Sequence, residues 1–401
     1  MMQYSKDPTA LRHYFADLHI HIGRTEQGNA VKISGSRDLT FANIAHEAAN
    51  RKGIELIGII DSHAPSVQTD IMRCLDRGEM EEIDGGGIRY KDTTILLGSE
   101  IEVRDPGMGA AHLLIYLPTL THMQEFTSWM SRHMKNVELS SQRIYVTARE
   151  LQSEVVSRGG LFVPAHIFTP HKSVYGSCSA RMADLLDLDQ IHGVELGLSA
   201  DSEMAGLISE LDRYSFLTNS DAHSLAKIGR EYNVLQMAAP NFEEFARVLN
   251  RDADRHVAAN YGLNPRLGKY HRTYCKQCES IIDEGTSTAA RCPYCDAAKF
   301  VRGVMDRICD IADREEPILP AYRPPYHYQV PLEFLPGLGP KKREALLARF
   351  GTEMHILHRA IAQELAEVVG EVLADEIIQA RTGKLGIVAG GGGTYGKITK
   401  I

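Results

Sequence analysis

The chain has 401 residues, which is enough for two or three domains and at least one sizeable core. Hydrophobic residues make up 43% and charged residues 24%, as in an ordinary globular protein, and no apolar stretch is long enough to span a bilayer. The polar start lacks the pattern of a signal peptide, so we expect a cytoplasmic, monomeric protein without membrane contact.

The formal net charge of −8 argues against a protein that coats nucleic acid without specificity. Charge nevertheless shifts along the chain, because residues 255–307 contain nine Lys or Arg against five Asp or Glu. Carboxylates that bind metal ions also count as negative until the ions are bound. The overall charge is therefore compatible with a local surface for DNA.

Short apolar segments alternate with helix-like segments from residue 16 to about residue 237. The predicted strands cover residues 16–22, 55–62, 93–103, 111–117, 160–166, 192–198 and 215–223, with a further one at 233–237. The predicted helices include residues 40–52, 122–134, 147–158 and 201–213. This alternation predicts a mostly parallel sheet, open or closed into a barrel, with an antiparallel hairpin where two strands follow each other closely at 93–117.

The first predicted strand places Asp17, His19 and His21 on one face and apolar side chains on the other. Two histidines at this spacing can direct both imidazoles to one point, which suits a metal ion. Acidic and histidine side chains also lie at the ends of the later strands. The complete set of candidate metal ligands is His19, His21, Asp61, His63, Glu100, His112, His166, Asp221 and His223. Because active sites of α/β barrels form at strand ends, we predict a metal centre there.

These motifs resemble those of the PHP (polymerase and histidinol phosphatase) superfamily, which implies a distorted (β/α)7 barrel with a metal-dependent phosphoesterase site. By this resemblance, all the candidate ligands except His63 are also catalytic. One metal ion would be held by His19, His21, Glu100 and Asp221, and Glu100 would bridge to a second ion held by His112 and His166. Asp61, His63 and His223 would surround a third ion. The resemblance thus implies two or three divalent ions, Zn, Mn or Mg.

The chain departs from the superfamily pattern at the third metal position. Asp61 and His63 are separated by a serine, whereas the superfamily often has Asp directly followed by His. A further histidine ligand after the first strand is also missing, with Gln27 and Lys32 nearby instead. Occupancy of the third position therefore stays open.

Four of the seven cysteines form two CxxC pairs separated by thirteen residues: Cys275, Cys278, Cys292 and Cys295. This spacing is typical of a structural tetrahedral zinc ion, whereas a redox CxxC motif would explain only one pair. Cys74, Cys178 and Cys309 are scattered and predicted to be small buried side chains. Basic and aromatic residues flank the pairs, among them Arg272 and Lys276, and favour a DNA surface over a solvated spacer.

A proline-rich stretch at 317–325 predicts a semi-rigid linker. The following segment, 334–343, resembles a helix–hairpin–helix motif, in which Gly337 and Gly339 permit a tight hairpin and Lys341 and Lys342 lie beside a helix start that can bind phosphate. An ordinary helical hairpin is the alternative. The glycine-rich tail, 389–396, is flexible by composition and either becomes ordered on a ligand or is a disordered end.

Several residues near the strand ends are candidates for substrate contact or support. Phe168, Lys172 and Tyr175 follow the His166 strand and are predicted either to contact DNA or to form a structural lid. Arg230 is predicted to hold a phosphate or a structural carboxylate. The two acidic candidates differ in role. Glu195 is predicted to support a metal ligand or line the substrate pocket, and Asp17 to orient a ligand histidine.

We expect a PHP barrel at 1–260, a four-cysteine zinc module at 261–312, a linker at 313–333 and an all-α helix–hairpin–helix domain with its tail at 334–401. This order resembles the endonuclease Q family, which implies repair of double-stranded DNA by cleavage 5′ to a deaminated base (uracil, hypoxanthine or xanthine) or an abasic site. The alternatives are a DNA nuclease without lesion specificity, a phosphatase of the histidinol-phosphate type and a non-catalytic DNA-binding scaffold.

Overall fold

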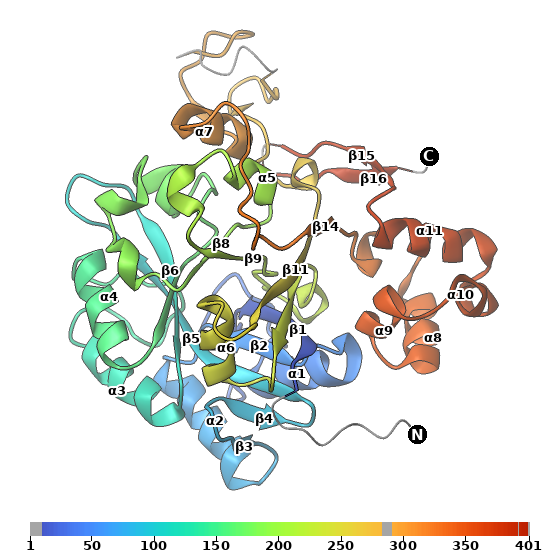
Figure 1. Ribbon diagram of the computed structural model, residues 1–401, viewed down its shortest axis with the longest axis horizontal. Helices are drawn as coiled ribbons and strands as arrows, with labels where there is room; N and C mark the ends of the chain where they lie inside the picture. The colour runs from blue at the N-terminus through green and yellow to red at the C-terminus, as the bar shows by residue number, and fades with distance from the viewer. Residues whose placement is uncertain (1–9, 283–290, 392, 400–401) are drawn as a thin grey trace.

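The computed structural model describes residues 10–282, 291–391 and 393–399. Seven strands form a closed ring at the centre of the molecule (Figure 1). In order around the ring they are β1 (Arg12–Ile20), β2 (Leu56–Ile59), β5 (Thr93–Val103), β6 (Ala111–Leu117), β7 (Leu161–Pro164), β8 (Gly193–Glu195) and β9 (Ser215–Leu217). β6 runs antiparallel to both of its neighbours. The α/β class and the distorted seven-stranded barrel are therefore confirmed.

Further strands extend the sheet beyond the ring on two sides. They are β10 (Tyr232–Met237), β11 (His256–Gly262) and β14 (Tyr326–Tyr328) beside β1, and β4 (Ile88–Tyr90) and β3 (Glu81–Glu82) beside β5. The predicted strands at 93–103 and 111–117 have these bounds in the structure and form the expected hairpin. The other ring strands, β2, β7, β8 and β9, are shorter than predicted. The polar residues predicted at the carboxyl ends of β2, β7 and β9 lie outside these strands.

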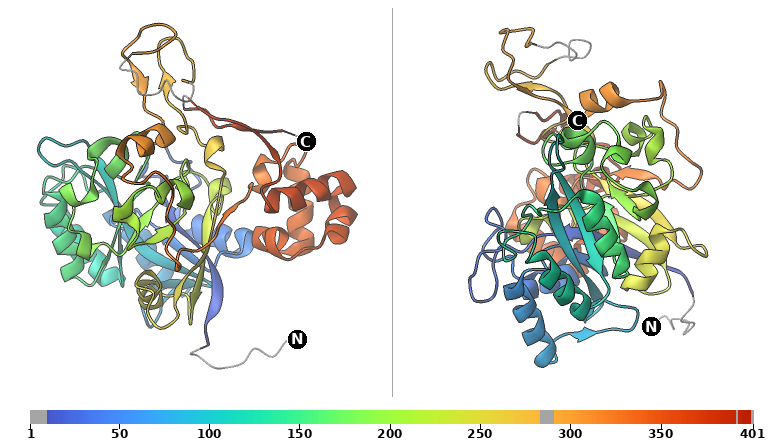
Figure 2. Two further views of the ribbon diagram at one scale, coloured as in Figure 1. Left: turned by 45° about the horizontal axis from the view of Figure 1, so that its top comes forward. Right: turned by 90° about the vertical axis from the view of Figure 1, so that its left-hand side faces the viewer.

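Helices cover the outside of the barrel (Figures 1 and 2). They are α1 (Phe41–Glu47), which continues as the π-helix η1 (Ala48–Lys52), α2 (Pro65–Asp76), α3 (Leu120–Met130), α4 (Ala148–Ser157) and α6 (Phe242–Leu249). Thr147 and Glu150 form the capping box that the sequence predicts for α4. Single turns η2 (Val174–Cys178), η3 (Met182–Asp184), η4 (Leu188–Gln190) and η6 (Leu225–Lys227) lie in the loops.

The helix predicted at 201–213 is wrong. The structure has a short α5 (Ser202–Ala205) followed by a separate turn, η5 (Ser209–Leu211). The carbonyl groups of Gly206 and Leu207 accept hydrogen bonds from the main chain of residues 318 and 313, at 3.0 and 3.2 Å. These carbonyls are thus bonded to the later chain segment instead of to a continuing helix.

The proline-rich stretch is bonded to the barrel along its length. The Arg314 side chain contacts Asp212, and the Arg323 guanidinium lies 3.2 Å above the Phe216 ring and donates to the Tyr214 carbonyl at 2.6 Å. The chain then enters the main sheet as β14. Residues 313–333 therefore contribute to the barrel sheet as well as connecting two parts of the chain.

Two smaller parts are attached to the barrel (Figure 2). A cysteine-bearing hairpin, β12 (Tyr274–Cys275) and β13 (Phe300–Val301), projects from one end between η7 (Pro265–Leu267) and α7 (Val304–Ile311). A helical part follows at the side, with η8 (Leu332–Phe334), α8 (Pro340–Phe350), α9 (Glu353–His358), α10 (Ala362–Val369) and α11 (Glu371–Arg381). The tail forms β15 (Gly386–Val388) and β16 (Lys397–Thr399). Within the described residues no helix combines the length and apolarity needed to cross a membrane.

Ion pairs fix the helical part against the barrel. Lys52 Nζ lies 2.8 Å from Glu353 Oε2, and Lys227 Nζ lies 2.7 Å from Glu333 Oε1. The Tyr232 hydroxyl, buried in the barrel sheet, also bonds the ring of His358 at 2.6 Å. These contacts place the predicted DNA-binding hairpin on a fixed side of the barrel.

Three buried asparagines complete the joint between β9 and the strands β1, β10 and β11. Asn219 Oδ1 accepts the Leu18 N–H at 3.0 Å, and Asn233 Nδ2 donates to the same oxygen at 3.0 Å. Asn233 Oδ1 accepts the Thr218 N–H and an amide hydrogen of Asn260, both at 2.9 Å. Side-chain amides thus supply hydrogen bonds that a longer strand ladder would otherwise provide.

We predict that Asn233→Leu destabilises the protein, because the buried Thr218 N–H loses its hydrogen-bond partner and the buried amides of Asn219 and Asn260 each lose one of theirs. Each such group costs about 1–3 kcal/mol. The free energy of unfolding, measured by urea denaturation, should therefore fall by roughly 3 kcal/mol or more. Gln236→Leu, on the same strand but half-buried, is the matched control and should change it by less than about 0.5 kcal/mol. Equal losses in the two variants would contradict the role of the amide network.

Candidate active site

Seven of the nine predicted ligands converge at one end of the barrel. They form three overlapping groups whose ligand atoms lie within 4.8 Å of one another. The groups are His19, His21 and Glu100; His21, Asp221 and His223; and Glu100, His112 and His166. Because the groups share His21 and Glu100, they form one continuous centre.

The first group has the spacing that a metal ion requires. His19 Nε2 lies 3.6 Å from Glu100 Oε1 and 3.5 Å from Asp221 Oδ1. His21 Nε2 lies 3.6 Å from Glu100 Oε2 and 3.4 Å from Asp221 Oδ1. Both Nε2 atoms are buried without a hydrogen-bond partner among the described residues. Such atoms are costly unless they bind something, and metal–ligand distances of about 2.0–2.2 Å fit this spacing, so these residues fit a divalent ion.

The second group is built around the same glutamate. His112 Nδ1 and His166 Nε2 lie 2.8 and 3.2 Å from Glu100 Oε1. Glu102, two residues further along β5, lies 3.8 Å from His112 Nε2 and 2.8 Å from Lys172 Nζ. These two partners hold the pKa of Glu102 down to about 2. Sequence reasoning missed Glu102, although its period-two spacing from Glu100 placed it on the same face of the strand.

Glu195 orients the first histidine. Both of its carboxylate oxygens lie 3.0 Å from His19 Nδ1, so the Nε2 atom of the ring faces the metal site. Glu195 also accepts the His166 N–H and an amide hydrogen of Asn219, both at 2.8 Å. A carboxylate behind a ligand histidine fixes its tautomer and strengthens it as a ligand. This geometry fits the predicted role of Glu195 as support for a metal ligand. Glu195 also lines the cavity, which fits its other predicted role in the substrate pocket.

Asp61 and His63 do not join the convergent groups that the structure describes. Asp61 Oδ2 accepts the Ile22 N–H at 2.7 Å and lies 3.1 Å from His21 Nδ1, so it supports His21 as Glu195 supports His19. The His63 ring bonds Ser99 Oγ at 2.8 Å. Asp61 Oδ1 has no hydrogen-bond partner in the described part of the chain, so a metal ligand role for Asp61 stays a prediction.

Two ligands adopt backbone conformations that side chains rarely take. His166 has φ 28° and Asp221 has φ 45°. Gly197 packs directly beneath the first of them, because a Cβ atom on Gly197 would lie 2.9 Å from the His166 Cβ. Such strain persists where the surroundings over-determine it, as at active sites.

Lys32 is a site residue that the sequence pattern alone did not identify as one. Its Nζ atom lies 3.4 Å from Glu100 Oε2 and 2.6 Å from Ser141 Oγ. The side chain is only 16% exposed, so its ammonium group forms part of the centre rather than of the surface. Lys32 therefore adds a fixed positive charge beside the carboxylate that joins two of the ligand groups.

A cavity of about 460 Å³ opens beside the ligands. Its lining includes Asp221 and His223 of the metal centre, together with Glu195 and Asn219. The lining also has a cationic and aromatic set, which consists of Lys227, Arg230, Lys269, Tyr270 and Tyr395. A cavity lined by both carboxylates and cations suits a phosphorylated ligand that also reaches metal ions.

Of the two roles predicted for Phe168 and Tyr175, the structure favours the structural one over a DNA contact. Phe168 and Tyr175 are buried and stack on each other with ring centroids 5.4 Å apart. The Tyr175 hydroxyl donates to Glu210 at 2.6 Å. The loop after β7 folds inward through η2 and so contributes to the core instead of to a surface. Lys172, by contrast, is half-exposed and paired with Glu102.

Asp17 and Arg230 act on the loop that carries Asp221. Asp17 accepts the N–H groups of Ser220 and Gly229, at 3.0 and 2.8 Å, and so anchors the loop instead of orienting a histidine ring. Arg230 Nε donates to the Ser220 carbonyl at 2.7 Å. The expected role of Asp17 is therefore corrected: it positions the metal-binding loop through its main chain.

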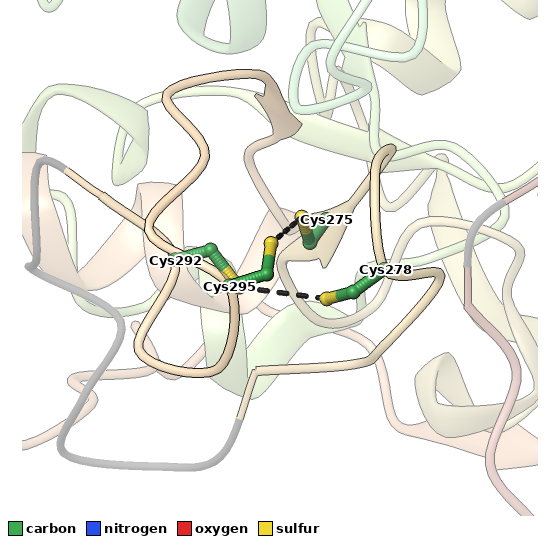
Figure 3. Close-up of side chains that lie close together, drawn as sticks. All are labelled: Cys275, Cys278, Cys292 and Cys295. Atoms are coloured by element: carbon green, nitrogen blue, oxygen red, sulfur yellow. Dashed lines mark hydrogen bonds between the residues drawn. The ribbon is translucent and has the colours of Figure 1, made fainter.

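The four paired cysteines converge in the projecting hairpin (Figure 3). Cys275 Sγ lies 3.6 Å from Cys295 Sγ, and Cys278 Sγ lies 3.6 Å from Cys292 Sγ. A tetrahedral zinc ion with Zn–S bonds of about 2.3 Å requires sulfur separations of about 3.8 Å, so the cluster fits such an ion.

The predicted DNA-binding residues of the two smaller parts differ in their surroundings. Arg272 is paired with Asp306 at 3.3 Å, whereas Lys276 is exposed. In the helical part, Gly337 has φ 86° and Gly339 caps α8. Both glycines are exposed, as are Lys341 and Lys342 in the first turn of α8. A helix start flanked by lysines fits the predicted phosphate site, although the turn before it, η8, is a 3-10 helix.

Comparison with known proteins shows the family. No family model matches the chain. The uncharacterized protein YqxK of Bacillus subtilis (strain 168) is 50% identical over 390 residues, which cover 97% of this chain and all of YqxK. The crystal structure of the lesion-specific endonuclease PfuEndoQ from Pyrococcus furiosus has a TM-score of 0.83 and 32% identity, over 97% of this chain and 96% of that one. The chain belongs to the endonuclease Q family.

A second endonuclease Q structure, in complex with a 27-mer duplex that has an abasic lesion at the active site, also has a TM-score of 0.83, with 31% identity and 97% coverage of both chains. Because these endonuclease Q matches span 97% of the chain, they include the cysteine hairpin and the helical part as well as the barrel. The family assignment therefore covers the barrel, the cysteine hairpin and the helical part together.

We predict that Glu195→Gln weakens metal binding in the barrel, because the amide is a poorer acceptor for the His19 ring and lacks its charge. Loss of such a supporting carboxylate typically costs 10- to 100-fold in metal affinity, roughly the effect expected here. Titration calorimetry with Zn²⁺ or Mn²⁺ would measure it. Glu203→Gln, an exposed glutamate on α5, is the matched control. An unchanged affinity in Glu195→Gln would refute the orienting role.

Proposed function

We propose that this protein is a DNA repair endonuclease that hydrolyses the phosphodiester bond 5′ to a deaminated base (uracil, hypoxanthine or xanthine) or to an abasic site in double-stranded DNA. The observation that carries the proposal is the seven convergent ligands beside a mixed cationic and aromatic cavity, in a chain that matches endonuclease Q along nearly its whole length.

The barrel residues divide into ligands and supports. His19, His21, Glu100 and Asp221 would hold one divalent ion, and Glu100, His112 and His166 a second. Zn, Mn or Mg ions held in this way polarise a phosphate and activate water for attack. His223, with Asp61 and His63, would take part in a third site.

The protein's own charges complete this arrangement. Glu195 keeps the His19 ring in the orientation that a ligand needs. Lys32 places an ammonium group beside Glu100, where it can neutralise charge that develops on the phosphate oxygens. No side chain has to act as the nucleophile in this scheme.

The cavity would receive the damaged nucleotide after it leaves the helix. A damaged base is easier to unstack than a paired one, which is one source of selectivity. Deamination replaces an amine donor with a carbonyl acceptor, and Lys269 offers only N–H donors to the cavity. Lys269 is therefore our candidate for contacting the new carbonyl.

The two smaller parts would hold the duplex. We propose that one structural zinc ion organises the cysteine hairpin, and that Lys276 on it contacts the DNA backbone. Gly337, Gly339, Lys341 and Lys342 would bind a phosphate at the start of α8. Such contacts position DNA without reading its sequence.

A cleavage assay tests the proposal. Matched duplexes carrying uracil, hypoxanthine, an abasic site or no lesion are incubated with Mg²⁺ or Mn²⁺, and the ends are mapped. We expect cuts 5′ to each lesion and little cutting of the undamaged duplex. Asp221→Ala, which removes a predicted metal ligand, should lower the rate by about 100- to 1,000-fold. Equal cutting of the undamaged duplex would instead indicate a nuclease without lesion specificity.

We further predict that each molecule contains one tightly bound zinc ion that depends on the cysteine hairpin. Cys292→Ser should lower the zinc content by one ion per chain, measured by mass spectrometry of elements after dialysis. Cys309→Ser on α7 is the matched control and should leave it unchanged; this cysteine is exposed, so the expectation that it is buried is wrong. Unchanged zinc content in both variants would rule out the assigned site.

A further inference from the structure

The glycine-rich tail is folded against the segment that precedes the cysteine hairpin and does not extend away from the molecule. After α11, the tail strands β15 and β16 run from the helical part toward the base of the cysteine hairpin (Figure 2). The N–H groups of Gly390, Gly393 and Gly396 donate to carbonyls of residues 266, 269 and 267, at 2.7, 3.2 and 2.9 Å. Three main-chain bonds therefore fix the turn between the two strands; Gly392 in this turn lies outside the described residues.

Close packing explains why glycines are needed here. A Cβ atom on Gly390 would lie 2.5 Å from the Gly396 nitrogen, and one on Gly396 would lie 2.3 Å from the Val388 carbonyl oxygen. These approaches leave no room for a side chain. The glycine content of the tail thus serves a tight turn, and Tyr395 is the one aromatic residue in it.

That turn brings Tyr395 into the wall of the active-site cavity. Its hydroxyl accepts a hydrogen bond from Arg230 Nη1 at 2.9 Å, and the Lys269 ammonium lies 4.6 Å from its ring centroid. The Phe334 ring of the helical part lies 6.3 Å away. Tyr395 is therefore held by residues from the barrel, from the segment before the cysteine hairpin and from the helical part.

We propose that Tyr395 is a specificity-determining residue whose ring packs against the base of the damaged nucleotide. This inference rests on the proposed function and assigns to Tyr395, in the lining of the active-site cavity, the contact with the base. The metal ligands Asp221 and His223 line the same cavity and would hold the scissile phosphate. An uncharged ring offers no charge to that phosphate, so the part of the nucleotide that it suits is the base.

The ring and the hydroxyl have separable roles. The hydroxyl is already bonded to Arg230, whereas the ring forms cavity wall. Stacking of a base on an aromatic side chain accepts any base, so one ring can serve both uracil and hypoxanthine. An abasic site lacks the base and gains nothing from the ring.

The test compares substrates with and without a base. Tyr395→Ala should lower kcat/KM for uracil and hypoxanthine duplexes by about tenfold or more relative to the abasic duplex, in keeping with the cost of losing one stacked base. Tyr395→Phe, which keeps the ring, should stay within about threefold of the wild type on all three. Val388→Ala, at a half-exposed position in the same tail, is the matched control and should behave as the wild type.

An equal loss on all three duplexes would overturn the proposal, because it would indicate a structural role for Tyr395, and so would the absence of any loss. Binding in the Asp221→Ala background, measured by fluorescence anisotropy with uncut duplexes, separates this inference from the proposed function. If the wild type cuts no lesion, the proposed function fails. If Tyr395→Ala then weakens binding only of the uracil and hypoxanthine duplexes, the role of Tyr395 is still supported. An equal effect on the abasic duplex overturns it.

Discussion

The carboxamide of Asn219 links the closure of the barrel to the chemistry of its metal centre. Its oxygen accepts the Leu18 N–H and an amide hydrogen of Asn233, which ties the segment after β9 to β1 and β10. Its nitrogen donates to Glu195, the carboxylate that orients His19. One buried side chain therefore both closes the ring and aligns a ligand, so the ligand geometry depends on the complete barrel.

The strained ligands depend on the same kind of support. Asp221 holds a left-handed backbone conformation because Asp17 bonds the Ser220 N–H on one side and Arg230 bonds the Ser220 carbonyl on the other. His166 is held because its N–H is bonded to Glu195 and Gly197 leaves room beneath it. The cost of each conformation is of the order of 1–3 kcal/mol, which buried charge-assisted hydrogen bonds can offset.

Much of the site could be predicted from the sequence, because alternation along the strands and polar residues at the strand ends mark its ligands. The hairpin at 93–117 and seven converging ligands could be predicted because both depend on local spacing along strands. The burial of Phe168 and Tyr175 could not, because the direction in which a loop folds depends on distant packing partners. The helix predicted at 201–213 failed for the same reason, since main-chain groups more than 100 residues later bond its carbonyls.

The net charge of −8 describes the whole chain and does not describe the surface that DNA would meet. Asp17, Asp61, Glu100 and Glu195 are buried, so their charges belong to the interior of the barrel and not to the surface that DNA would meet. Of the described lysines and arginines, Lys32 is the one paired with Glu100. Buried carboxylates are unfavourable unless cations join them. Divalent ions at the centre would supply this charge balance, and an acidic chain can still have cationic residues in the lining of its cavity.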